Sequence, residues 1–360
     1  MIQRPPDPSA GDDFVHAVYD AIPKVELHCH VEGSVRPQTV AELARKSGRT
    51  LPVEDPMELY RFTSLDSFLA IFWMVQETLV EPGDWERIAY ESLVDGAAHG
   101  LRYREMFFTP ARHLAAGQAL AGIIDGLTAG IEAAETDVRV QCRLIADMDR
   151  AYGPAAGLEL VEQLAELRQQ GGAEKVIGVG MDSTELGVDL AAFAKPFELA
   201  RRHGLRSTGH AGEAVGAGPQ NIVIALDVLG LERIDHGIAV MDDPALVRRM
   251  ATDRVPLTVC PSSNVVIANR YPSLREHPFR KMRETGLLAT INTDDPAMTD
   301  LDLGSEYRDV AEAQGLDFDD LAAVALDGIE ASWLDDVDRR VMRTEFSETL
   351  ARLRPQAPTQ

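Results

Sequence analysis

The chain has 360 residues, of which 45% are hydrophobic, and a formal net charge of −23 at pH 7. This length and composition allow a large buried core in one or two domains. The negative charge argues against binding to nucleic acid or anionic membranes, because both present negative phosphates. No apolar run reaches the ~20 residues that a membrane span needs.

Residues 1–13 are rich in Pro and Asp, and we expect them to form a loose N-terminal tail. They have neither a basic start nor an apolar core, which favours a cytoplasmic location. The three cysteines, Cys29, Cys142 and Cys260, lie in apolar runs. A sparse, odd set argues against a disulfide framework, so we expect reduced packing residues.

Short runs of β-forming residues alternate along the chain with longer segments of helical periodicity. Eight runs are predicted as strands, over residues 25–30, 101–108, 138–148, 176–182, 205–212, 233–237, 256–261 and 287–294. Strands that alternate with helices form parallel sheets with right-handed crossovers. Eight such units predict an α/β protein of the (β/α)8, or TIM, barrel class. An open doubly wound sheet is the alternative, but no Gly-rich phosphate loop follows the first run.

One connection, residues 31–100, is far longer than an ordinary loop, and we expect a helical insertion there. It leaves from the carboxyl end of the first strand, which is the active-site face of such barrels. We expect its apolar stripe to pack on the barrel, and Phe68, Phe72 and Trp73 are candidates to roof a pocket as part of a lid. Residues 316–353 are predicted as extra C-terminal helices, and 354–360 as a polar tail. Residues 14–353 thus form a single predicted domain.

His28 and His30 end the first predicted strand and point to the same side, because strand side chains alternate. In a barrel the carboxyl ends of all strands open at one mouth. His210, His236 and the pair Asp294-Asp295 end later strands and are expected at the same place. So many buried polar groups are unfavourable unless a metal or substrate uses them. Three imidazoles and a carboxylate suit zinc.

The remaining histidines lie in helical or loop contexts, and we expect them to be ordinary surface residues. They are His16, His99, His113, His203 and His277.

The chain resembles the adenosine/adenine deaminase family of the metal-dependent amidohydrolase superfamily. The matching stretches, in order, are PKVELHCHVEGSVRP (23–37), LDSFLAIF (65–72), HAGE (210–213), ERIDHG (232–237), LTVCPSSNV (257–265) and INTDDP (291–296). The likeness extends from residue 22 to about residue 346. The other zinc deaminase signature, H-x-E with P-C-x-x-C, is absent.

The resemblance implies a zinc-dependent aminohydrolase (EC 3.5.4) of purine metabolism with one zinc per chain. The implied zinc ligands are His28, His30, His210 and Asp294. Glu213 would donate a proton to purine N1, His236 would orient and stabilise the zinc-bound hydroxide, and Asp295 would bind purine N7. Zinc hydroxide attacks purine C6 in this scheme and ammonia leaves, giving inosine or hypoxanthine.

Three further acids, Glu32, Asp182 and Glu185, are expected to contact the small-molecule substrate. Adenosine deaminases usually carry H-x-H-L-D-G, whose acid reaches the ribose, whereas this chain has Glu32 there. Residues 182–185, Asp-Ser-Thr-Glu, are closer to the D-S-S-E of the adenine deaminase branch, but residues 107–110 match neither branch. We therefore expect a modest preference for free adenine, or a modified 6-aminopurine, over adenosine.

Two other functions stay open. One is a mononuclear-metal amidohydrolase acting on another aminopurine or a cyclic amide; the fourth predicted strand, 176–182, has no interior lysine to bridge two metals. The other is a non-catalytic purine-binding relative, against which the complete ligand set argues. The oligomeric state does not follow from the sequence.

Overall fold

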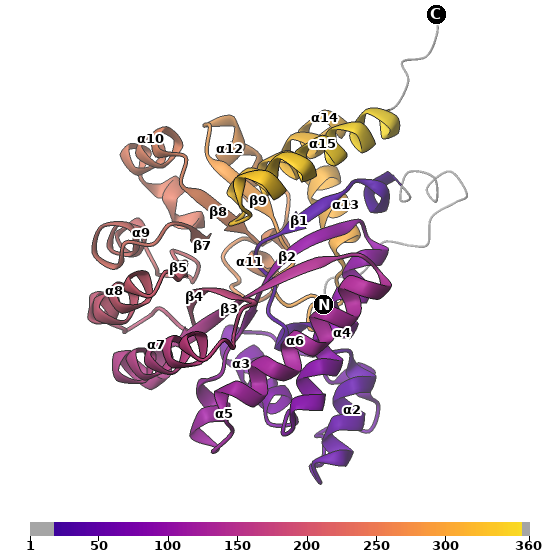
Figure 1. The fold of residues 1–360 in the computed structure, drawn as a ribbon. Coiled ribbons are helices and arrows are strands. Elements are labelled where there is room, and N and C mark those ends of the chain that lie inside the picture. Colours follow the sequence, from indigo (N-terminus) through magenta and orange to yellow (C-terminus); the bar gives the residue numbers. More distant parts are fainter. Residues whose placement is uncertain (1–17, 355–360) are drawn as a thin grey trace, which may run out of the picture.

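The computed structural model describes residues 18–354, in which parallel strands lie at the centre and helices surround them (Figure 1). The strands are β1 (Lys24–Glu26), β2 (Leu101–Phe108), β3 (Gln141–Asp149), β4 (Val176–Asp182), β5 (Arg206–Ser207), β6 (His210–Ala211), β7 (Ile234–His236), β8 (Pro256–Val259) and β9 (Leu288–Ile291). They pair in chain order, β1 to β5 in one sheet and β6 to β9 in another, and the strands of each pair run parallel.

Hydrogen bonds join the two sheets at both of their edges. At residues 208–209, between β5 and β6, Thr208 N–H donates to Val179 O (3.1 Å) and Asp235 N–H donates to Gly209 O (3.0 Å). At the other edge, His30 N–H donates to Asp294 O (2.8 Å). The segments that follow β9 and β1 therefore meet. The predicted (β/α)8 class is confirmed, with the fifth strand divided into two short pieces.

Helices cover the outside of the sheets and alternate with the strands. The α-helices are α2 (Pro37–Lys46), α3 (Leu65–Gln76), α4 (Pro82–Ala98), α5 (Ala111–Ala115), α6 (Leu120–Asp137), α7 (Gly153–Gln169), α8 (Ala194–Arg202), α9 (Pro219–Ile224), α10 (Pro244–Asp253), α11 (Pro261–Val266), α12 (Phe279–Glu284), α13 (Leu303–Gln314), α14 (Phe318–Ala331) and α15 (Asp336–Leu353). Short 3₁₀ turns are η1 (Glu32–Ser34), η2 (Pro56–Glu58), η3 (Arg150–Tyr152), η4 (Leu190–Phe193) and η6 (Ile238–Asp242), and η5 (Ala225–Leu229) is a π-helical turn.

The long connection after β1 is helical, as its periodicity predicts. It contains α2, α3 and α4, and α3 begins with a capping box in which Ser64 Oγ accepts from Ser67 N–H. The predicted C-terminal helices are α14 and α15. No helix within residues 18–354 is long and apolar enough to cross a membrane. Residues 1–13 and most of the predicted C-terminal tail lie outside the described residues.

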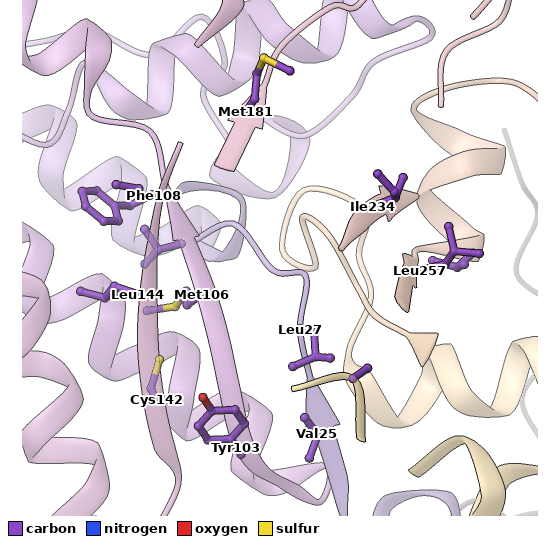
Figure 2. Packing of buried hydrophobic residues seen from close by; sticks show 14 of the residues in the cluster. Val25, Leu27, Tyr103, Met106, Phe108, Cys142, Leu144, Met181, Ile234 and Leu257 are labelled. Atoms are coloured by element: carbon purple, nitrogen blue, oxygen red, sulfur yellow. The ribbon is translucent and has the colours of Figure 1, made fainter. Parts of the chain in front are cut away.

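The main core lies between the strands and the surrounding helices (Figure 2). On β2, Met106 and Phe108 belong to this core, as do Cys142 and Leu144 on the neighbouring β3. Phe107 lies between Met106 and Phe108 and packs instead on the ring of His28, at 4.9 Å between centroids. Strand alternation therefore separates the structural core from the functional interior. The three cysteines are free and buried, as expected.

Candidate metal and catalytic site

The predicted metal ligands lie together at the carboxyl ends of the strands. Ligand atoms of His28, His210, His236 and Asp294 all lie within 4.8 Å of one another. His30 Nε2 adjoins them, at 3.4 Å from His210 Nε2 and 3.4 Å from Asp294 Oδ1. These five groups exceed the four ligands of an ordinary zinc site. The hydrogen bonds that the histidine rings make on their other side, away from the cluster, show which ring nitrogens have a free lone pair.

Those hydrogen bonds fix the tautomers of His210 and His28. His210 Nδ1 lies 3.1 Å from the carbonyl oxygen of Met181. Because a carbonyl only accepts, Nδ1 carries the proton and Nε2 keeps its lone pair. Thr258 Oγ1 donates to Asp235 Oδ1 (2.8 Å) and therefore accepts from His28 Nδ1 (3.1 Å). In both rings Nε2 is the nitrogen that faces the site, which is the arrangement of metal-binding histidines.

The charges at this point fit a bound cation. Burial lowers the pKa of His28, but the carboxylates of Asp294 and Asp235 outweigh it and raise the pKa to about 10. Nε2 of His28 is buried and makes no hydrogen bond, although it lies 3.0 Å from Asp294 Oδ1. A nitrogen lone pair and a carboxylate oxygen repel each other at this distance unless a proton or a metal ion neutralises them. The donor set therefore suits a divalent metal.

Asp294 is held in a conformation that presents one oxygen to the histidines. Its φ is 65°, which is uncommon for a residue other than Gly. Ser263 Oγ donates to Oδ2 at 2.5 Å, so Oδ1 is the oxygen beside His28 and His30. Burial opposes ionisation, but the imidazoles of His28 and His236 hold the pKa of Asp294 well below its usual range. Asp294 is therefore a carboxylate.

Glu213 lies next to this group, and its carboxyl group holds its proton more tightly than an ordinary glutamic acid. Burial raises its pKa to about 8, with further contributions from the negative charges of Asp294 and Glu185. Its Oε1 lies 3.7 Å from His236 Nε2, and its side chain lines the cavity. A neutral carboxyl group in this position can donate a proton to a bound molecule.

Glu185 holds the loop that carries Glu213. Its carboxylate accepts backbone N–H groups from Gly212 (2.8 Å), Glu213 (2.7 Å) and Ala214 (3.0 Å), and it also accepts from Asn221 Nδ2 (2.7 Å). Glu185 lines the cavity, as expected of a substrate contact, but both of its oxygens are already bonded to protein groups. Its structural partners were not visible in the sequence.

A cavity opens beside the metal ligands and is roofed by helix α3. The α3 residues that line it are Leu65, Phe68, Leu69, Phe72, Trp73 and Gln76. Phe68, Phe72 and Trp73 were the candidates for this roof; Phe68 and Phe72 are buried and Trp73 is half-buried. The opposite wall carries His30, His210, Glu213 and Asp295. The cavity thus combines one aromatic face with one face of titratable groups, as small-molecule sites commonly do.

Asp295 lies at the base of the cavity against Gly33. A Cβ atom at Gly33 would lie 1.8 Å from Asp295 Oδ1, so no other residue type fits there. Burial and the neighbouring Asp294 charge raise the pKa of Asp295 well above its usual range. Its Oδ1 is buried and makes no hydrogen bond. Asp295 therefore contributes to the cavity lining a carboxyl group that favours the protonated form and has an unpaired oxygen.

Glu32 and Asp182 lie on either side of Thr109. Glu32 Oε1 accepts from Thr109 N–H (2.8 Å), and Thr109 Oγ1 donates to Asp182 Oδ2 (2.5 Å). Asp182 and Thr109 line the cavity, whereas Glu32 is fully buried and is not among its lining residues. Burial raises the pKa of Glu32 to about 7 and that of Asp182 to about 8. The structure thus places Glu32 behind the wall, where it also accepts from Gln76 Nε2 (3.5 Å).

Two of the predicted surface histidines are buried, so that expectation was wrong for them. His113 is 2% exposed and His277 is 4% exposed, whereas His16 lies outside the described residues. Sequence reasoning also missed Arg150, which donates from Nη1 to Ser183 O (2.6 Å) and from Nη2 to His210 O. His113 and His277 do not follow a predicted strand. Arg150 follows β3 directly, and this position was the only sign in the sequence that it belongs to the site.

A parallel α/β barrel with histidines and an aspartate at the carboxyl ends of its strands has the architecture of metal-dependent hydrolases. The family model described as adenosine deaminase matches residues 23–349, and the chain belongs to this family.

The chain is also similar to individual proteins along most of its length. It is 37% identical to the adenine deaminase of Streptomyces coelicolor over 88% of this chain and 93% of that protein. Among solved structures, an adenine deaminase from Arthrobacter aurescens aligns with a TM-score of 0.86 and 33% identity, over 91% of this chain and 99% of that one. An amidohydrolase from Burkholderia ambifaria with bound Zn aligns with a TM-score of 0.86 and 29% identity, over 98% of this chain and 96% of that one.

Proposed function

We propose that the protein is a zinc-dependent hydrolytic deaminase whose preferred substrate is the free base adenine. Water replaces the exocyclic amino group, so adenine and water give hypoxanthine and ammonia. The observation that carries the proposal is the neutral carboxyl group of Glu213 beside a cation-attracting group of histidines and Asp294. The similarity to adenine deaminases from Streptomyces coelicolor and Arthrobacter aurescens supports the same substrate.

The residues proposed to hold the metal are His28, His30, His210 and Asp294. Three imidazole nitrogens and one carboxylate oxygen form a donor set that suits zinc, and the related Burkholderia ambifaria structure contains Zn. The bound metal supplies Lewis acidity, which makes a water molecule nucleophilic near neutral pH. Burial, together with the neighbouring His28 and His236, lowers the pKa of His30 to about 3, so its imidazole stays neutral and can act as a ligand.

The residues around the cavity then have separate tasks. Glu213 holds its proton at purine N1, because attack at C6 makes N1 more basic as the ring loses aromaticity. Asp295 donates from its neutral carboxyl group to N7 and fixes the orientation of the ring. His236 lies between Glu213 and Asp294 and interacts with the oxygen that attacks. When the tetrahedral centre collapses, the C6–N bond breaks and ammonia leaves.

The wall that holds Thr109 is the proposed determinant of substrate size. Gln76, the last residue of α3, forms a hydrogen-bonded group with Thr109 and Glu32, and Asp182 is bonded to the hydroxyl of Thr109. A fixed wall leaves little space for a sugar on the purine. A misplaced ribose, or a buried carboxyl group without a partner, changes binding by roughly 1–3 kcal/mol, which is sufficient for about 10²-fold discrimination.

We further propose that residues 14–353 form one domain, in which residues 31–100 act as a lid through α3. The aromatic side chains of α3 that line the cavity place this segment beside the site. Limited proteolysis with and without substrate tests whether the segment closes over the cavity. The cytoplasmic location stays a prediction.

The decisive experiment measures ammonia and hypoxanthine formed from adenine by the purified, metal-analysed protein. We expect turnover with about one zinc per chain, and loss of turnover after chelation. Absence of ammonia release from adenine, with metal bound, would refute the proposed function. Turnover of a different aminopurine in the same assay would favour the alternative amidohydrolase.

A further inference from the structure

A buried chain of hydrogen bonds lies behind His236 and leads away from the cavity. His236 Nδ1 is 2.9 Å from Asn264 Nδ2, and Asn264 Oδ1 is 3.1 Å from His277 Nε2. His277 Nδ1 in turn lies 3.2 Å from the backbone nitrogen of Phe279. All of these side chains are buried, with His236 and Asn264 0% exposed. The hydrogen bonds between these side chains are therefore shielded from water.

The direction of every hydrogen bond in this chain follows from its far end. Phe279 begins α12, and its backbone N–H can only donate. His277 Nδ1 is therefore the acceptor, and the single proton of the neutral ring lies on Nε2. Nε2–H donates to Asn264 Oδ1, which leaves the Asn264 amide nitrogen facing His236. That nitrogen can only donate, so His236 Nδ1 is an acceptor.

We infer that Asn264 and His277 are positioning residues that fix His236 as the tautomer with its proton on Nε2. The Nε2–H group faces the site, where it is buried and makes no hydrogen bond within the protein. It lies 3.7 Å from Glu213 Oε1 and 3.8 Å from Asp294 Oδ2. His236 is therefore a hydrogen-bond donor aimed at the space between these two acids.

This assignment separates His236 from the other histidines at the site. His28 and His210 have their protons on Nδ1 and present a lone pair, whereas His236 presents a proton. A nitrogen that carries a proton cannot bind a metal or remove a proton from water. The catalytic consequence rests on the proposed function. In that reaction His236 donates to the attacking oxygen and stabilises the charge that develops on it.

The surroundings make this arrangement rigid. His236 has a φ of 57°, and its ring is 4.7 Å from that of His28. Asn264 lies in α11, where its backbone N–H donates to Cys260 O (2.9 Å). The His277 ring packs edge-on against Tyr271 at 5.1 Å between centroids. A pre-oriented donor of this kind needs no rearrangement during the reaction.

The first test reads the tautomer directly in the protein as purified, with its metal content measured. Long-range ¹H–¹⁵N correlation spectra of ¹⁵N-histidine-labelled protein distinguish a protonated from an unprotonated ring nitrogen, and a His236→Gln spectrum identifies the signals of His236. We expect the proton of His236 on Nε2. A proton on Nδ1 in the wild-type protein would overturn the inference.

The second test reverses one hydrogen bond with Asn264→Asp. The carboxylate is nearly the same size and still accepts from His277, but it cannot donate to His236. We expect the His236 proton to move to Nδ1, kcat to fall by roughly 10²-fold or more, and the metal content to stay unchanged. Unchanged His236 signals in this variant would show that Asn264 does not set the tautomer.

Three further variants separate tautomer control from folding and charge. Asn269→Asp makes the same chemical change on an exposed residue of the same segment, and we expect wild-type spectra and rates. His277→Gln keeps a donor for Asn264 Oδ1, so we expect it to preserve the Nε2–H tautomer better than His277→Leu does. Equal His236 signals in the His277→Gln and His277→Leu variants would show that His277 does not influence the tautomer of His236. Failure of the wild-type protein to deaminate adenine would refute the proposed function but leave the tautomer result standing.

Discussion

Glu185 and Glu213 are joined by a hydrogen bond of 2.7 Å in which the backbone N–H of Glu213 donates to the carboxylate of Glu185. The side chain of Glu185 thus fixes the position of the Glu213 backbone. Because the same carboxylate also accepts from Gly212 and Ala214, it sets the direction in which Glu213 enters the cavity.

Glu185→Gln should therefore lower kcat without removing the metal. The amide has one oxygen instead of two, and its NH₂ group would face backbone donors, so at least one buried N–H loses its acceptor at about 1–3 kcal/mol. We expect kcat to fall by roughly 10-fold to 10²-fold, with a lower Tm. Glu174→Gln, on an exposed residue, is the matched control. Wild-type kinetics for Glu185→Gln would show that the loop does not depend on this carboxylate.

Glu213→Gln keeps the size and polarity of the side chain but removes its acidic proton. We expect the protein to retain its metal while kcat falls by roughly 10²-fold or more, which is the usual scale for general acid catalysis. Steady-state kinetics and metal analysis on one preparation check the fall in kcat and the retention of the metal. A rate close to wild type would exclude Glu213 as the proton donor.

His210→Ala should remove a metal ligand and the hydrogen bond to Met181 O together. We expect the metal content to fall well below one equivalent, and activity to disappear with it. Metal analysis after dialysis against a weak chelator makes the comparison with wild type. Two equivalents of metal in the wild-type protein would contradict the single site.

Adenine and adenosine should differ as substrates. If the wall around Thr109 excludes a sugar, kcat/KM for adenine should exceed that for adenosine by about 10²-fold. Both are measured under identical conditions by ammonia release. A preference for adenosine would reject the substrate assignment and leave the metal site and Glu213 unaffected.

Glu306 should make stability depend on pH. Burial raises its pKa from 4.5 to about 8, although Ser262 N–H and Oγ–H donate to it. The folded state then binds more protons than the unfolded state between these values, so the stabilising contribution is complete below 4.5 and is lost as the pH rises through about 8. Glu306→Gln removes this dependence. We expect it to have the higher Tm at pH 8 but no such advantage at pH 5, measured by thermal unfolding; equal differences at both pH values would contradict this.

The sequence predicts the regular parts of this molecule well and the interactions between distant segments poorly. Strands β2 and β4 have the predicted bounds. β2 follows Gly100 directly and ends two residues before Pro110, and both residue types commonly bound strands. The predicted fifth strand is divided, since Thr208 and Gly209 bond to different neighbours on either side. The predicted run, LRSTGHAG, contains Gly209 at the division, and a Gly inside a strand often marks such an interruption.

At the site, strand alternation explains why His28 and His30 converge, and barrel topology explains why His210 and Asp294 join them. The same reasoning failed for His277, because its burial depends on how the irregular segment between α11 and α12 folds. The hydrogen-bond partners of Glu185 could not be predicted from the sequence either. They lie 27 to 36 positions along the chain, and no periodic pattern links them.

The backbone hydrogen bonds that Asp294 makes with His28 and His30 join the last strand of the barrel to the first at the candidate metal site. During synthesis the first two histidines leave the ribosome long before the aspartate exists. At ~5–20 residues per second, the delay is on the order of ten to fifty seconds. The nascent chain therefore holds only an open pair of imidazoles for most of that time, a weak and unselective chelator. Tight binding of the proposed metal therefore requires closure of the ring of strands, which brings Asp294 to the histidines.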